Sequence, residues 1–151
     1  MKAVVQRAQN ASVTVEGRVT GSIARGLLVY LGVARGDTEK EALWMAEKIA
    51  NLRIFEDAEG RMNLSIKDLN EKKEESFGVL AVSQFTLLAD AAKGRRPYYG
   101  DAAEPEKARA LYEYFIKKVA EQGLVCEAGV FQARMDVSYT NAGPVTIILE
   151  S

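Results

Sequence analysis

The first 33 residues combine short alternating stretches with one continuous apolar run, and this pattern constrains the fold more than any other part of the sequence. Residues 2–7 and 12–15 alternate apolar and polar side chains, which is the period of a strand with one buried face. A turn is expected at Gly17, after which residues 18–23 would return as the hairpin partner. Residues 26–33 are more continuously apolar, as in a strand buried on both faces. The N-terminal third therefore predicts β structure.

Two later segments predict helices through their caps and apolar spacing. Thr38 and Glu41 fit a capping box, in which the threonine accepts from a helical amide and the glutamate reaches back. Apolar residues follow at helical spacing, which predicts a helix over residues 39–51. Pro105 suits a first helical turn, and the apolar stripe that follows it ends at Gly123. Two main helices are therefore expected.

Most of the remaining chain is expected to be strand. Apolar runs predict further strands at residues 53–55, 77–84, 125–131, 134–139 and 145–150. Residues 70–76 are charge-rich and predict a solvated connector. Because no repeat, low-complexity segment or linker interrupts the chain, residues 1–151 are expected to form one β-rich α/β domain.

The sequence contains no histidine. This excludes Ser-His-Asp and Cys-His catalysis, and it also excludes the common histidine-based zinc sites. The carboxylates are scattered and there is no Cys/His cluster, so neither a metal site nor a cofactor is expected. An enzyme of this composition must work with hydroxyls, carboxylates, lysines, backbone groups or the atoms of its substrate.

Charge and cysteine content limit the partners and the compartment. Lys and Arg number 20 and Asp and Glu 21, and this net charge of −1 argues against a general coat for DNA or RNA. A local basic patch that meets one end of an RNA remains compatible with it. The single cysteine, Cys126, is expected to be a buried strand residue and fits a reducing cytoplasm. No apolar stretch approaches the roughly 18 residues of a membrane span, and no signal-peptide core is present, so a cytoplasmic protein without a membrane partner is expected.

The segment Ser83-Gln84-Phe85-Thr86 closes the apolar run of residues 77–84. Its hydroxyls could simply end a strand by bonding to nearby backbone. Alternatively, the strand end offers amides for an oxyanion hole, with the Thr86 hydroxyl near a scissile ester. A threonine that lacks a histidine or a free terminal amine has no evident activator, which argues against Thr86 as a covalent nucleophile.

The segment Asn141-Ala142-Gly143-Pro144-Val145-Thr146 opens the last apolar run. Taken alone, Gly143-Pro144 is typical of a turn that leads into a strand. Proline is also the residue before which a cis peptide bond is least costly. Two consecutive carbonyls held rigidly there could instead accept hydrogen bonds from a substrate amine.

Lys93, Arg95 and Arg96 cluster with a glycine and a proline between residues 93 and 97. Such a cluster is most often a solvated turn, but it also fits an exposed loop that contacts RNA phosphates. Tyr98 and Tyr99 follow directly and could stack on the unpaired bases of a single-stranded end. Both interpretations are compatible with the sequence.

Taken together, these motifs resemble the D-aminoacyl-tRNA deacylase family, whose marks are S-Q-x-T and a terminal N-x-G-P-V-T. The resemblance also covers Ala3-Val4-Val5-Gln6-Arg7, Gly26-Leu27-Leu28-Val29, Asn51-Leu52-Arg53-Ile54-Phe55-Glu56-Asp57 and Lys93-Gly94-Arg95-Arg96-Pro97. It implies mixed sheets that form a barrel-like core flanked by the two helices. It also implies a homodimeric hydrolase that cleaves the ester between a D-amino acid, or glycine, and the 3′-terminal adenosine of tRNA, without a cofactor.

The resemblance assigns roles to the two motifs. The reaction at residues 83–86 would depend on main-chain groups and on the 2′-hydroxyl of the terminal adenosine. Gly143-Pro144 would be cis and would reach from one subunit into the active site of the other. Its carbonyls would hold the substrate α-ammonium so that an L side chain meets the backbone, while a D side chain, or glycine, is accepted.

Four further residues receive supporting roles by the same resemblance. Arg7 would hold the orientation of the Gly-Pro carbonyls, assisted by Gln6 and Asn141. Met135 would lie beside the bound aminoacyl-adenosine. The family commonly shows G-A-x-M at this point, whereas residues 132–135 here read Gln-Ala-Arg-Met, so the pocket lining is expected to differ locally.

Two alternatives remain open on the sequence. One is a paralogous deacylase that removes a mischarged L-amino acid and is expected to carry a trans Gly-containing motif. The other is a noncatalytic module that binds an RNA end through the Arg95 loop. The second would bind aminoacyl-tRNA without changing its rate of deacylation.

Overall fold

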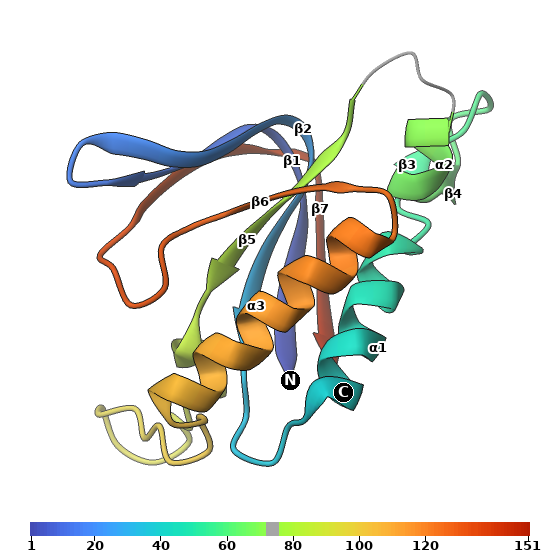
Figure 1. Cartoon of the computed structure of the whole chain (residues 1–151). Coiled ribbons are helices and arrows are strands. Elements are labelled where there is room, and N and C mark those ends of the chain that lie inside the picture. The colour runs from blue at the N-terminus through green and yellow to red at the C-terminus, as the bar shows by residue number, and fades with distance from the viewer. Residues whose placement is uncertain (72–75) are drawn as a thin grey trace.

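The computed structural model describes residues 1–71 and 76–151. In chain order the elements are β1 (Lys2–Val15), β2 (Arg18–Gly32), α1 (Glu39–Ala50), β3 (Phe55–Glu56), β4 (Met62–Leu64), α2 (Ile66–Glu71), β5 (Gly78–Ser83), the 3-10 helix η1 (Phe85–Leu88), α3 (Pro105–Glu121), β6 (Val125–Ala128) and β7 (Asp136–Glu150). Five strands form one mixed sheet in the order β6-β5-β2-β1-β7, while β3 and β4 pair separately (Figure 1). The sheet is parallel between β2, β5 and β6 and antiparallel elsewhere.

The long hairpin of β1 and β2 lies in the middle of the five-stranded sheet. Its register runs from Lys2 opposite Gly32 to Val15 opposite Arg18, with a shift between Val13 and Thr14. Asn10, whose φ is +50°, lies where the pairing of β1 with β7 shifts register. Gly26 lies opposite Gly78 at the start of the parallel pairing between β2 and β5. A Cβ at Gly26 would overlap the carbonyl oxygen of Gly78, so this close approach requires glycine.

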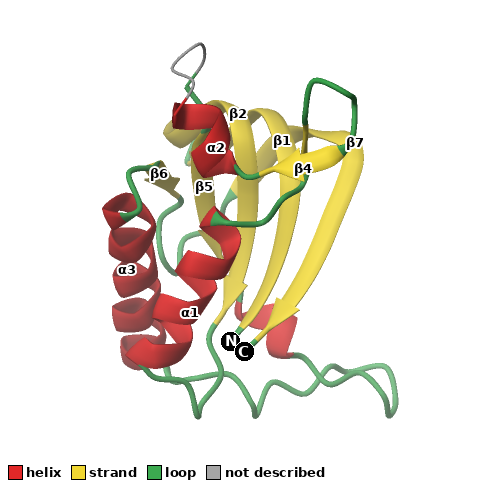
Figure 2. Ribbon diagram, turned by 90° about the vertical axis from the view of Figure 1, so that its right-hand side faces the viewer, coloured by secondary structure: helices red, strands yellow, loops and turns green. Residues whose placement is uncertain are grey.

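The two faces of the sheet bury different clusters. Because successive strand residues point to opposite faces, Leu27 and Val29 pack with the helices while Leu28 lies in the other cluster. Helices α1 and α3 cover the first face, as Figure 2 shows. The second cluster consists of Ala8, Ala11, Val13, Ile23, Leu28, Leu80 and Val82.

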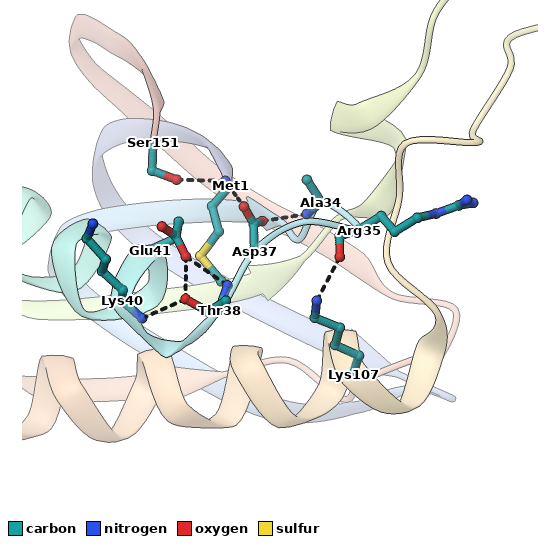
Figure 3. A network of polar contacts seen from close by, with 9 residues as sticks. All are labelled: Met1, Ala34, Arg35, Asp37, Thr38, Lys40, Glu41, Lys107 and Ser151. Atoms are coloured by element: carbon teal, nitrogen blue, oxygen red, sulfur yellow. Dashed lines mark hydrogen bonds and ion pairs between the residues drawn. The ribbon is translucent and has the colours of Figure 1, made fainter.

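The start of α1 is tied to the sheet by a polar network (Figure 3). Thr38 is the N-cap, and its side chain accepts from Lys40 while Glu41 accepts from the Thr38 amide, so the predicted capping box is confirmed. Just before it, Asp37 accepts from the α-ammonium group of Met1 at 2.7 Å and from the amide of Ala34 at 2.6 Å. The side chains of this ion pair are 0% and 8% exposed, so the interaction lies inside the protein.

The predicted β-rich α/β fold with two main helices is confirmed, and several boundaries were wrong. The strands predicted at 2–7 and 12–15 are one strand, as are those at 18–23 and 26–33 and those at 134–139 and 145–150. The strand predicted at 53–55 begins only at Phe55, and the 125–131 strand ends at Ala128. Of the connector predicted at 70–76, residues 70 and 71 end α2, and residues 72–75 lie outside the described part of the chain.

The barrel-like core implied by the resemblance is not confirmed. The five-stranded sheet has β6 and β7 as its two edges, and among the described residues these strands do not pair with each other. A single chain therefore forms an open, curved sheet. Its edge strand β7 contains no fully buried residue.

Candidate functional site

A cavity of about 520 Å³ lies where β5 ends, between η1, the start of α3 and the segment that leads into β7. Its lining residues are Leu31, Val33, Val82, Ser83, Gln84, Phe85, Ala102, Ala103, Pro105, Ala108, Tyr112, Phe131, Gln132, Ala133, Met135 and Val137. None of these lining residues carries a formal charge. The cavity is therefore an apolar recess whose polar groups come mainly from one strand end.

That strand end is the Ser83-Gln84-Phe85-Thr86 segment. Gln84 ends the strand, and its amide donates to the carbonyl of Leu31 at 2.8 Å. The amides of Phe85 and Thr86 open the helix η1, where the first N–H groups have no acceptor within the helix. Two adjacent amides are what an oxyanion hole requires, and of these two residues Phe85 lines the cavity; the engaged Gln84 amide is not available for one.

The Thr86 hydroxyl accepts a hydrogen bond from the side-chain amide of Gln84. Thr86 is exposed and is not among the residues that line the cavity, whereas Ser83, Gln84 and Phe85 are. No carboxylate, amine or imidazole is recorded as its partner among the described residues, so the geometry provides no base that could activate this hydroxyl.

The far wall of the cavity comes from α3 and the segment after β6. Tyr112 donates from its buried hydroxyl to the carbonyl of Ala81 at 2.8 Å, and burial raises the pKa of this phenol well above its ordinary value. The ring of Phe131 lies 6.0 Å from that of Tyr112, and the Arg109 guanidinium lies 5.1 Å from the Phe131 ring centroid. The wall is thus a packed aromatic surface, held in place by one buried hydrogen bond.

Backbone hydrogen bonds hold the segment that leads into α3. The amide of Ala103 donates to Val33, and the amide of Arg35 donates to Asp101, both at 2.9 Å. Lys107 on α3 donates to the Arg35 carbonyl at 2.7 Å, as seen in Figure 3. These hydrogen bonds connect the cavity wall to the loop that contains Asp37.

Gly143 and Pro144 lie elsewhere, in β7 beside Arg7. Their peptide bond is cis, as the resemblance implied. The Arg7 Nε donates to the carbonyl of Ala142 at 3.1 Å, and one Nη donates to the carbonyl of Ile54 at 3.2 Å. Arg7 thus holds the carbonyl that precedes the Gly-Pro pair; no hydrogen bond to the Gly143 or Pro144 carbonyl is recorded among the described residues.

A network of side-chain hydrogen bonds lies around the Gly-Pro pair. Thr146 accepts from Gln6 at 3.0 Å and from Asn141 at 3.1 Å, and Gln6 accepts from the Tyr139 hydroxyl at 2.8 Å. Tyr139 also faces Tyr30, whose pKa is raised to about 12, mainly by burial and then by this neighbour. The structure therefore brings Gln6, Arg7 and Asn141 together around the Gly-Pro pair, as expected from the resemblance.

The predicted site residues consequently form two separate groups in one chain. Met135 joins Ser83, Gln84 and Phe85 at the cavity, whereas neither Gly143 nor Pro144 lines it. Each group is internally well ordered. A single chain does not bring the two groups together.

The basic loop precedes Tyr99, whose ring contacts Phe85 of the cavity wall. Lys93, Arg95 and Arg96 are all exposed, and the loop that carries them is closed by paired hydrogen bonds between Asp90 and Tyr98. Nothing in this geometry contradicts the prediction of a phosphate-contacting loop.

Several site residues were missed by sequence reasoning. Tyr112 lines the cavity from the helix α3 and Phe131 from a turn, and the sequence had singled out neither of them as a site residue. Thr146, in contrast, belongs to the motif that had already been singled out.

Within residues 1–71 and 76–151 there is no cluster of His, Cys, Asp or Glu able to hold a metal ion. In the same part of the chain, no helix is both long and apolar enough to cross a membrane.

Comparisons with known proteins cover the whole chain. The family described as D-Tyr-tRNA(Tyr) deacylase matches residues 4–150. A D-aminoacyl-tRNA deacylase of Koribacter versatilis (strain Ellin345) is 57% identical, with 100% of this chain and 97% of the relative covered. One of Geotalea uraniireducens (strain Rf4) is 56% identical, covering 100% and 94%.

Two solved structures share the fold. A protein described as c-Myc DNA Unwinding Element Binding Protein superposes with a TM-score of 0.89 at 42% identity, covering 100% of this chain and 99% of that one. A probable eukaryotic D-amino acid tRNA deacylase superposes with a TM-score of 0.79 at 18% identity, covering 98% and 97%. The second likeness concerns the fold alone.

Proposed function

Because this chain belongs to the D-Tyr-tRNA(Tyr) deacylase family and is a D-aminoacyl-tRNA deacylase, a hydrolase, we propose that it also accepts glycyl-tRNA and selects substrates by chirality rather than by side-chain size. Its substrate class is aminoacyl-tRNA, and the bond that breaks is the ester to the 3′-terminal adenosine. Residues 1–151 act as one deacylase domain in the cytoplasm. The observation that carries the proposal is the uncharged cavity at the end of β5, which Phe85, the first residue of helix η1, lines.

The reaction relies on main-chain groups and on the substrate. Water attacks the ester carbonyl carbon, and the amides of Phe85 and Thr86 stabilise the oxyanion that develops. The bond to the ribose oxygen then breaks, releasing the free amino acid and the tRNA. Because Thr86 has no activating base, the adenosine 2′-hydroxyl assists the proton transfers in place of a protein side chain.

Chirality is selected by a second copy of the chain. The carbonyls of Gly143 and Pro144 accept from the substrate α-ammonium and fix it together with the ester, which leaves open space on only one side of the α-carbon. An L side chain would meet the backbone, while a D side chain or the hydrogen of glycine would not. Support comes from the exposed Gly-Pro pair, which is held by Arg7 and Asn141 but does not line the cavity of its own chain. A two-fold dimer would complete both sites at once.

The test is a deacylation assay with D-tyrosyl, L-tyrosyl and glycyl-tRNA. We expect hydrolysis of the D-tyrosyl and glycyl esters and none of the L-tyrosyl ester above the uncatalysed rate. Hydrolysis of L-tyrosyl-tRNA would favour the paralogous activity, and binding without hydrolysis would favour the noncatalytic module. In parallel, light scattering at assay concentrations should give the mass of a dimer; a monomer with full D-over-L selectivity would contradict the two-chain site.

A further inference from the structure

Three aromatic side chains are exposed at or close in sequence to the cavity wall. Phe85, Tyr98 and Tyr99 have exposed fractions of 57%, 68% and 39%. The rings of Phe85 and Tyr99 meet edge to face, with centroids 5.1 Å apart, and Phe85 also lines the cavity. Grouped exposed aromatic rings at the edge of a pocket are typical of a surface that receives a ligand.

The backbone holds these rings in place. Asp90 and Tyr98 exchange two hydrogen bonds of 2.8 Å, and the carbonyl of Tyr99 accepts from the amide of Ala102 at 3.1 Å. The Tyr98 ring lies against Gly100, where an added Cβ would overlap the ring atoms. One surface of this ring is therefore supported by backbone while most of the side chain faces solvent. Such preorganisation lowers the ordering cost of binding a flat ligand.

Positive charge is carried by the loop that leads into Tyr98 and Tyr99. The loop that the Asp90–Tyr98 pair closes carries Lys93, Arg95 and Arg96, all exposed. The only carboxylate within residues 90–98 is that of Asp90, and it accepts from the amide of Ala92 at 2.8 Å. The surface thus combines stacking rings with three cations against one carboxylate.

This combination suits a ligand that is both flat and polyanionic. Single-stranded nucleotides bind through base stacking on aromatic rings together with phosphate contacts to basic side chains. We propose that Phe85, Tyr98 and Tyr99, with the loop cations, form a subsite that stacks the unpaired nucleotides preceding the terminal adenosine. The inference rests on the proposed function, which places that adenosine in the adjoining cavity.

The test uses three probes in which a D-tyrosyl group is joined to the terminal adenosine by a non-hydrolysable 3′-amide. The first probe is this nucleoside alone, the second is preceded by two cytidines, and the third by two abasic nucleotides. We expect the cytidine probe to bind most tightly to the wild-type protein and the abasic probe to lie between the other two. Affinities are measured by calorimetry at several salt concentrations.

Variants separate stacking from charge. Tyr98→Ala/Tyr99→Ala should weaken the cytidine probe about tenfold or more, the usual effect of losing base stacking, and leave the other two probes unchanged. Gly100→Ala keeps both rings but displaces that of Tyr98, so it should show part of the same loss. Arg95→Ala/Arg96→Ala should weaken the cytidine and abasic probes alike and lower the log–log salt slope by up to about 1.4. Trp44→Ala, which removes an aromatic ring that is 40% exposed on α1, is the matched control and should change nothing.

The outcomes are distinguishable. If the cytidine probe binds no more tightly than the nucleoside, or if the tyrosine variant weakens all three probes equally, the subsite is absent while the deacylase function stands. If the tyrosine variant dissociates a dimer in light scattering and spares the cytidine probe, the rings belong to a contact between copies, and the proposal is overturned. If the nucleoside probe does not bind and no D-aminoacyl-tRNA is hydrolysed, the proposed function itself fails.

Discussion

Substituting Gly143 by alanine tests how the Gly-Pro pair is held. Gly143 has a φ of +115°, and a Cβ there would lie 2.5 Å from the Arg7 Nη2 and 3.1 Å from a methyl group of Val145. The backbone conformation costs an L residue about 1–3 kcal/mol. The Arg7 side chain is flexible and should move, losing its hydrogen bond to Ala142, and a bond to a charged donor contributes about 1.5–3 kcal/mol. We therefore expect Gly143→Ala to lower the free energy of unfolding by about 2.5–6 kcal/mol, and the Tm by about 5–24 °C for a chain of this size.

Gly143→Ala should also lower the activity on D-tyrosyl-tRNA. Once the Ala142 carbonyl is released, the two carbonyls that follow it lose their orientation, and the substrate ammonium loses at least one acceptor. A charge-assisted bond of about 1.5–3 kcal/mol corresponds to a loss of about 10–150-fold in kcat/KM for D-tyrosyl-tRNA. The measurement is single-substrate deacylation kinetics with D-tyrosyl and L-tyrosyl-tRNA, alongside thermal denaturation.

The matched control is Gly17→Ala at the tip of the hairpin. Gly17 has a φ of +76°, but an added Cβ there meets nothing within 4 Å, so this variant has backbone strain without displacing any side chain. It should lose stability and keep wild-type D-over-L preference. In an Arg7→Ala background, Gly143→Ala should add little beyond its backbone cost. If Gly143→Ala matches the Gly17 variant in both assays, the reasoning about Arg7 is wrong.

Four further predictions concern single groups. Thr86→Ala should lower kcat/KM by no more than about tenfold, because a hydroxyl without a base contributes little proton transfer; a 2′-deoxy terminal adenosine should cost more, and a stable acyl-threonine adduct would reverse this order. Tyr112→Phe removes one of the hydrogen bonds to the Ala81 carbonyl, which also accepts from an amide, and should lower the free energy of unfolding by about 1 kcal/mol; an unchanged Tm would contradict this. Asp37→Asn leaves the buried α-ammonium group without its counter-charge and should cost about 3 kcal/mol in urea denaturation, whereas a loss below about 1 kcal/mol would show that the pair is not buried in solution. Burial raises the pKa of Cys126 to about 12, so at pH 8 the thiol stays protonated and iodoacetamide should label the native protein at least about 100-fold more slowly than the urea-unfolded chain; equal rates would refute the shift.

Local sequence patterns predicted the elements whose signals are local. The helix at residues 39–51 was predicted from a capping box that the structure contains, and α1 ends one residue earlier. β1 was predicted as two separate pieces because its alternation breaks near Asn10, where the pairing with β7 shifts register while the pairing with β2 continues. Helix α2 is only six residues long, too short for a periodic signal, and its start is marked mainly by the Ser65–Asp68 hydrogen bonds.

The candidate site was predictable only where it resides in motifs. Ser83 to Thr86 and Asn141 to Thr146 were singled out because they place polar groups and a Gly-Pro pair at the ends of apolar runs and because they match the marks of the family. The cavity walls were not, because Tyr112 and Phe131 come from segments distant in sequence and have the apolar spacing of ordinary core residues. That Arg7 binds the carbonyl of Ala142, rather than those of the Gly-Pro pair, depends on bulged pairing between β1 and β7, which no local pattern specifies.

The neutrality of the cavity connects these observations. A substrate α-ammonium entering it meets no carboxylate among the lining residues, so its charge has to be met by carbonyl dipoles, and the Gly-Pro pair is the rigidly held candidate. Neutral acceptors also bind less strongly than a buried carboxylate would, because the net gain from a hydrogen bond is small compared with that from a desolvated ion pair. After hydrolysis the amino acid carries a new carboxylate in an apolar recess that offers it no cation among the lining residues. The cost of keeping that charge away from water favours release, so we expect the proposed site to release its amino-acid product readily.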